Sequence, residues 1–247
     1  MNIMRQLVIV IILLVLATPL FAAEEKREKI GEALGEPVYR DQIDERGDLY
    51  AQFYNLFIMP FQKKYLEANK DELEVKDWEI EYVARYFEKK YNEDLKKKDS
   101  DLNQQLAVNR KRLKEVEQKL TNKNLPAGDR EKLEKEKNYL ENMLRPPGKD
   151  YAKYLLSGWK YYRLLYNNFG GGRVIWEQEG PVPYDAMLKW LRQHEQQGDF
   201  KITDPKLHEA FYSYWKAVKN SRSFLDKQRI QSEFLHPAWE PVKKNDN

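Results

Sequence analysis

The chain has 247 residues, no cysteine, and 43 Lys and Arg against 40 Asp and Glu. The lack of cysteine excludes disulfides and thiolate metal sites, and the near balance of charge gives no reason to expect nucleic acid as a partner. Aromatic residues make up 13% of the chain, which supplies material for a packed core and argues against wholesale disorder.

Residues 1–23 have the pattern of a secretory signal peptide. Arg5 is the only charged residue, an apolar run covers positions 7–16, and the small residues Ala22 and Ala23 offer a cleavage site. An uncleaved anchor helix is the alternative, but the apolar run is shorter than the roughly 20 residues that span a bilayer. We therefore expect an exported protein, periplasmic in a bacterium, without a stable membrane span after cleavage.

The N-terminal part of the mature chain is expected to be mainly helical. A polar lead-in at 24–34 precedes a short extended segment at 38–39. Apolar residues at helical spacing then predict a helix over 49–66, which Pro60 kinks or restarts. A second long helix is predicted over 71–98, with a broad apolar face opposite Lys and Glu.

Residues 101–147 differ in character, because aromatic residues become rare and charges dominate. Leu106, Leu113 and Leu120 are seven residues apart, and Asn109 is the polar position of a second line in this heptad pattern. A Pro-Gly turn interrupts the pattern, which then resumes in a weaker form. Two helical arms around such a turn predict an antiparallel helical hairpin.

The C-terminal part is again predicted to be helical, with short extended pieces. Helices are expected over 150–169 and 185–197, and Pro205 is well placed at the first position of a further helix. The segments "RVIW" at 173–176 and "DFKI" at 199–202 are β-prone and short, and should be extended.

The predicted fold class is all-α: a multi-helix domain with a protruding antiparallel helical hairpin and at most a short two-stranded β ribbon. In that ribbon, "RVIW" at 173–176 would pair with "PVY" at 37–39. The expected organisation is a signal peptide at 1–23, an N-terminal helical segment at 24–100, the charged hairpin at 101–147, and a C-terminal helical segment at 148–247 that packs with 24–100.

Three consecutive glycines, Gly170, Gly171 and Gly172, raise the question of a phosphate-binding loop. A Walker loop needs a following Lys and hydroxyl at the start of a helix, and a dinucleotide loop needs a strand before it and a helix after it. Here the glycines follow a predicted helix and precede an extended segment. They are therefore predicted to end the helix and turn the chain.

The sequence gives no signal of catalysis. The three histidines lack the spacing of a zinc site, and no serine lies in a nucleophile-elbow motif. We expect no enzyme activity, no cofactor and no metal. The alternative, an enzyme with an unrecognised site, would require Arg173, Glu177 or His194 to meet in a deep pocket.

One segment resembles a known family. The stretch "KIGEALGEPVYRDQI" at 29–43, followed by helices rich in Phe and Tyr, is similar to the N-terminal region of the SurA and parvulin-type periplasmic chaperones. The matching positions are Gly35, Val38, Tyr39 and Ile43, with Asp41 or Asp44 at the helix start. The resemblance implies a helical peptide-binding body. The parvulin isomerase domain is lacking, so the resemblance implies peptide binding without isomerase activity.

We therefore expect a chaperone-like protein that holds unfolded or extended polypeptide in an apolar groove. The alternative is a structural or assembly subunit that docks an envelope protein partner through the hairpin. Exposed apolar residues on the outer face of the hairpin would favour docking, whereas a wholly charged face would favour a passive spacer. The candidate groove residues are Phe53, Phe57, Tyr82, Tyr86, Trp159, Tyr162 and Trp176.

Overall fold

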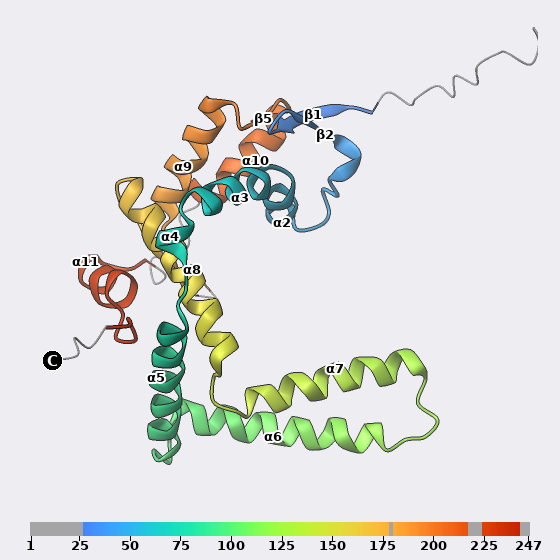
Figure 1. The fold of residues 1–247 in the computed structure, drawn as a ribbon. Coiled ribbons are helices and arrows are strands. Elements are labelled where there is room, and N and C mark those ends of the chain that lie inside the picture. The colour runs from blue at the N-terminus through green and yellow to red at the C-terminus, as the bar shows by residue number, and fades with distance from the viewer. Residues whose placement is uncertain (1–26, 178–179, 217–223, 243–247) are drawn as a thin grey trace, which may run out of the picture. The chain divides into compact units, whose positions relative to one another are not determined.

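The computed structural model describes residues 27–177, 180–216 and 224–242, so the expected signal peptide lies outside the described residues. The chain is mostly helical, as predicted, with two small antiparallel sheets (Figure 1). It divides into two compact units. Unit 1 comprises Met1–Gln62 and His194–Tyr214, and unit 2 comprises Lys63–Gln193 and Trp215–Asn247.

Unit 1 combines a three-stranded sheet with short helical segments. Its strands lie in the order β2-β1-β5 and all pairs are antiparallel. The elements are β1 (Lys29–Ala33), β2 (Glu36–Tyr39), a 3-10 turn (Arg40–Gln42), α2 (Leu49–Phe53), a π-helical segment (Tyr54–Ile58) and β5 (Phe200–Ile202). Three helices contribute residues to both units: α3 (Met59–Ala68), α9 (Tyr184–Gln197) and α10 (Pro205–Lys216).

The core of unit 1 is aromatic. Phe61 stacks on Phe200 with ring centroids 5.3 Å apart, and Phe57 meets Phe211 edge-on at 6.4 Å. All four side chains are at most 2% exposed. Such stacked and edge-on ring pairs add to the free energy gained from burying apolar area, which is how a unit with only short elements obtains a core.

Arg40 connects three separate parts of unit 1. Its guanidinium donates to the carboxylates of Glu28, Glu45 and Asp204. Asp204 also accepts hydrogen bonds from the backbone N–H groups of Lys206 and Leu207, so it caps the start of α10. The backbone bond from Leu207, followed by the Arg40 bond, holds the pKa of Asp204 below its ordinary value.

The prediction of at most a two-stranded ribbon was wrong. Strand β1 lies in what the sequence suggested was a polar lead-in, and it pairs with β2 on one side and β5 on the other. Leu34 and Gly35, both at positive φ, close the tight turn between β1 and β2. The predicted pairing of "RVIW" with "PVY" was also wrong, because 37–39 pairs with β1. The local pattern is too polar and too short to reveal β1, which is completed by a strand about 170 positions away.

Unit 2 is built almost entirely from helices. Its elements are α4 (Lys70–Leu73), α5 (Asp77–Leu95), α6 (Asp101–Leu120), α7 (Ala127–Met143), α8 (Lys149–Asn168), β3 (Ile175–Glu177), β4 (Gly180–Val182), α11 (Lys227–Arg229) and a π-helical segment (Ile230–Leu235). Strands β3 and β4 form the two-stranded sheet. The helices expected at 150–169 and 185–197, the strand within 199–202 and the helix start at Pro205 are all confirmed.

The helix predicted over 71–98 is interrupted. Helix α4 ends at Leu73, Glu74 leaves the helical region with ψ near 125°, and α5 begins at Asp77. The new start is capped, because the Glu79 carboxylate accepts from the backbone N–H of Lys76 at 2.7 Å. Helical periodicity continues across the break, so the sequence pattern alone did not show it.

The core of unit 2 lies between α5, α8 and the C-terminal segment. Val83, Leu156 and Trp159 pack there with residues of the segment 225–234. The indole N–H of Trp159 donates to the Phe234 carbonyl at 2.6 Å, and Trp239 meets the Trp159 ring edge-on at 5.2 Å. The C-terminal segment therefore closes the core over α8.

The three glycines turn the chain, and the structure explains why there are three. Gly170, Gly171 and Gly172 have φ of 73°, 65° and 108°, which are values that residues with a Cβ rarely adopt. At Gly172 a Cβ would also lie 2.6 Å from the Cβ of Asp185. Asp185 accepts from the backbone N–H and the Nε of Arg173 at 2.8 and 2.7 Å. Burial would raise the pKa of Asp185, but these hydrogen bonds outweigh burial and lower it.

We predict that Gly172→Ala destabilises the protein more than Gly170→Ala. Each change puts an L-residue in the left-handed region at a cost of about 1–2 kcal/mol. Gly172→Ala adds a clash with Asp185 worth about 1–3 kcal/mol, whereas Gly170 faces only the flexible end of Lys189. Urea unfolding of both variants measures the difference, and equal unfolding midpoints would contradict the close approach to Asp185.

Candidate functional site

Five of the seven residues expected to line a groove contribute to packing. Phe53 and Phe57 are 2% and 0% exposed in the core of unit 1, and Trp159 is 6% exposed in the core of unit 2. Tyr82 and Tyr162 are half-buried and pack against the same unit 2 core. A bound chain therefore has little access to these five side chains.

The other two expected groove residues differ from each other. Tyr86 is half-buried and meets Phe87 edge-on with ring centroids 5.3 Å apart. Trp176, on β3, is 46% exposed. Of the seven, Trp176 is thus the one with a largely open ring, and a binding surface has to be sought among other residues.

Each of the three residues named for a possible enzyme site bonds a side chain outside this set. Arg173 bonds Asp185, Glu177 accepts from the Tyr184 hydroxyl, and His194 Nδ1 lies 2.7 Å from Asp199. Arg173 and Glu177 belong to unit 2, and His194 belongs to unit 1. Within the residues that the structure describes, no group of three or more acidic or histidine side chains is placed to hold a metal ion.

A groove lies between α8 and the segment that runs from the end of α3 through α4. Its volume is about 570 Å³, which is within the range of ~300–1,000 Å³ for ligand pockets. Its lining combines apolar side chains with charged ones. The lining residues are Leu66, Lys70, Asp71, Leu73, Glu74, Ser157 and Tyr161, and we call this feature the α8 groove.

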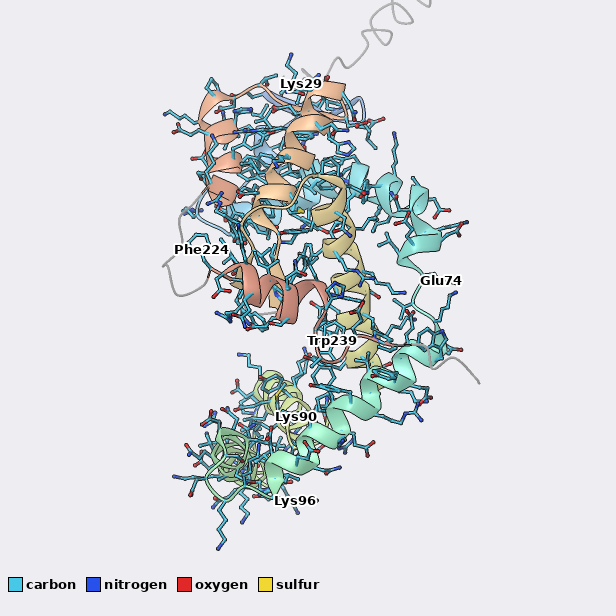
Figure 2. All side chains as sticks on the ribbon, turned by 90° about the vertical axis from the view of Figure 1, so that its left-hand side faces the viewer. Lys29, Glu74, Lys90, Lys96, Phe224 and Trp239 are labelled. Carbon is cyan, nitrogen blue, oxygen red and sulfur yellow. The ribbon has the colours of Figure 1, made fainter. Side chains whose placement is uncertain are left out.

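Lys160 fixes the wall of the α8 groove at the helix break. Its ammonium donates to the Glu74 carbonyl at 2.5 Å and to the Glu79 carboxylate at 2.8 Å. The Lys160 and Glu79 side chains are both 11% exposed. Glu74 is at the break between α4 and α5 (Figure 2), so this contact joins the break to α8.

A row of side chains on α8 leads along the helix into the groove. Tyr154, Ser157 and Tyr161 are three and four residues apart, and this spacing places them on one side of α8. The core side of the helix carries Leu156 and Trp159 instead. Tyr154 is 57% exposed, and Tyr161 is 8% exposed at the groove.

The sequence pattern of α8 could have predicted this row. Helix α8 carries aromatic residues over more than the ~100° of a usual core-facing stripe, so one packing partner cannot bury all of them. In the structure, Tyr151 and Tyr154 are 45% and 57% exposed.

A second exposed apolar surface lies on α6 and α7, which run side by side (Figure 1). Arg112 Nε donates to Glu136 at 2.7 Å across the two helices, and this bond raises the pKa of Arg112. Val108 precedes Arg112 by one turn and Tyr139 follows Glu136 by one turn, so both lie on the side of the ion pair. Val108, Tyr139 and Met143 are 64%, 60% and 47% exposed, and we call them the α6–α7 patch.

No family model, no curated protein and no solved structure matches this chain. The resemblance of residues 29–43 to the SurA family therefore stays a prediction. Among the helices within 27–177, 180–216 and 224–242, none is both long and apolar enough to cross a bilayer. Function has to be inferred from the two surfaces of unit 2.

We predict that Lys160→Met opens the wall of the α8 groove. The change leaves the buried Glu79 carboxylate without its cation and should cost about 2–4 kcal/mol of unfolding free energy. Hydrogen exchange should rise at 74–79. Lys153→Met, at an exposed position on the same helix, is the control and should change neither quantity. Equal stability of the two variants would show that Lys160 does not hold the break.

Proposed function

We propose that this chain is an exported, helical polypeptide-binding protein that holds unfolded or extended segments in a chaperone-like manner, in the periplasm of a bacterium. The α8 groove, with the exposed Tyr154 leading into it, is the observation that carries the proposal. Export follows from the predicted signal peptide at 1–23. The resemblance to SurA-type chaperones agrees with this role but adds no residue to the site.

The distribution of exposed apolar side chains supports this role. Among the described residues, all the large apolar side chains that are exposed belong to unit 2. They are Leu66, Trp78, Val108, Tyr139, Met143, Tyr151, Tyr154, Trp176 and Val242. Unit 2 therefore offers the exposed apolar side chains that a surface for other chains would use.

Binding in the α8 groove would proceed by area and by ring contacts. An extended segment lying along α8 would place an apolar side chain against Leu66 and Leu73, and another against the ring of Tyr154. Burial of apolar area is not directional, and a tyrosine ring offers a large rigid contact with a polar end. Such a surface accepts many sequences, as a holder of unfolded chains requires.

A structural or assembly subunit remains the second candidate, and the α6–α7 patch favours it. In this role α6 and α7 would be a protruding antiparallel hairpin, and an envelope partner would place an apolar helix face on Val108 and Tyr139. Both side chains are at least 60% exposed. A hairpin that only separated other parts of the protein would not need them.

A pair of matched variants separates the two functions. Leu66→Ser with Tyr154→Ser removes one aliphatic side chain from the α8 groove and one aromatic side chain from the α8 row beside it, and Val108→Ser with Tyr139→Ser removes the same types from the patch. We expect the groove variant to need about 10-fold more protein to suppress aggregation of an unfolded outer-membrane protein, because Leu and Tyr together contribute on the order of 1–2 kcal/mol. The patch variant should suppress aggregation as the unchanged protein does.

Crosslinking in the intact envelope is the second measurement, and it shows which partners each variant keeps. Loss of crosslinked partners in the patch variant alone, with no aggregation suppression by the unchanged protein, would contradict the chaperone-like function and select the assembly subunit. Equal suppression by the unchanged protein and the groove variant would show that the α8 groove is not the holding site.

A further inference from the structure

We infer that the α8 groove selects polypeptide segments in which Lys or Arg stands next to apolar residues. This inference builds on the proposed function, since it names the class of segment that the same site takes. The inference depends on the charged residues at the rim of the groove, because the apolar lining alone would not distinguish basic from acidic segments.

The rim of the groove carries uncompensated negative charge. Asp71 and Glu74 line the groove and are exposed, and neither carboxylate lies in an ion pair anywhere in 27–177, 180–216 or 224–242. Lys70 also lines the groove, but its ammonium lies 3.3 Å from the Glu67 carboxylate. The charges left for a ligand on this wall are therefore both negative.

The cation that contacts Glu74 is already engaged. Lys160 binds the Glu74 carbonyl and the Glu79 carboxylate, and its side chain is only 11% exposed. It therefore serves the fold and does not neutralise the rim. The α8 residues that line the groove, Ser157 and Tyr161, carry no formal charge, so the negative charge is confined to the side of 71–74.

The apolar part of the groove lies beside this acidic wall. Leu66 is 37% exposed, Leu73 is half-buried, and the ring of Tyr161 forms part of the lining. A segment that placed an apolar side chain here would bring its neighbouring side chains to Asp71 and Glu74. A Lys or Arg at the neighbouring position gains an ion pair there, whereas an Asp or Glu meets like charge.

The test uses three labelled peptides of equal length that share their apolar residues and differ only at the positions between them. These positions hold Lys and Arg in the first peptide, Ser and Gln in the second, and Asp and Glu in the third. Fluorescence anisotropy with the purified protein at low salt should show the basic peptide binding about 5-fold tighter than the neutral one, as expected for two exposed ion pairs. The difference should shrink towards zero at ~0.5 M salt.

The decisive variant is Asp71→Asn with Glu74→Gln, which keeps the shape of both side chains. It should lose the preference for the basic peptide and bind the neutral peptide as before. The matched control is Asp129→Asn with Glu134→Gln, which removes two exposed carboxylates from α7 and should keep the full preference.

The outcomes separate this inference from the proposed function. If all three peptides bind equally to the unchanged protein, and Leu66→Ser weakens all of them, the charge selection is refuted while the polypeptide-binding groove stands. If no peptide binds, the proposed function fails and the inference fails with it. If the preference survives in Asp71→Asn with Glu74→Gln, basic segments bind elsewhere and the inference is wrong.

Discussion

The contact of Lys160 with the break between α4 and α5 determines much of unit 2. One ammonium holds both the free Glu74 carbonyl and the Glu79 carboxylate that caps α5. A helix that breaks leaves backbone carbonyls without partners, and the Lys160 ammonium supplies a donor to one of them. A buried lysine in turn needs an anion, and the Glu79 carboxylate supplies it. Because the contact joins the break to α8, it also places α4 across from Ser157 and leaves the α8 groove between them.

Helix α8 serves two purposes on two of its sides. One side, with Leu156 and Trp159, packs into the core that α5 and the C-terminal segment complete. The other side, with Tyr154 and Ser157, leads into the groove. A helix fixed on one side by a core and by an indole hydrogen bond is a rigid base for a binding surface, and rigid surfaces lose less entropy when a flexible chain binds. The acidic rim at Asp71 then adds selectivity to a surface whose apolar part is permissive.

The sequence predicted the long elements well because their information is local. Helix α8 has a strong apolar periodicity, and Pro205 marks the start of α10. Strand β1 was missed because its partner β5 is far along the chain, and the break after Leu73 was missed because a tertiary hydrogen bond stabilises it. The residues of the candidate site were predicted least well. Periodicity identifies apolar stripes, but only packing decides which stripe is covered, so Phe57 is buried while the groove lies elsewhere.

The most direct test of the polypeptide-binding role is hydrogen exchange of the purified protein with and without a saturating basic–apolar peptide. Binding in the α8 groove should slow exchange in two segments that are separate in sequence, 66–74 and 150–161, and leave α6 and α7 unchanged. Protection confined to α6 and α7 would place the binding surface on the α6–α7 patch. That result would contradict the assignment of polypeptide binding to the α8 groove.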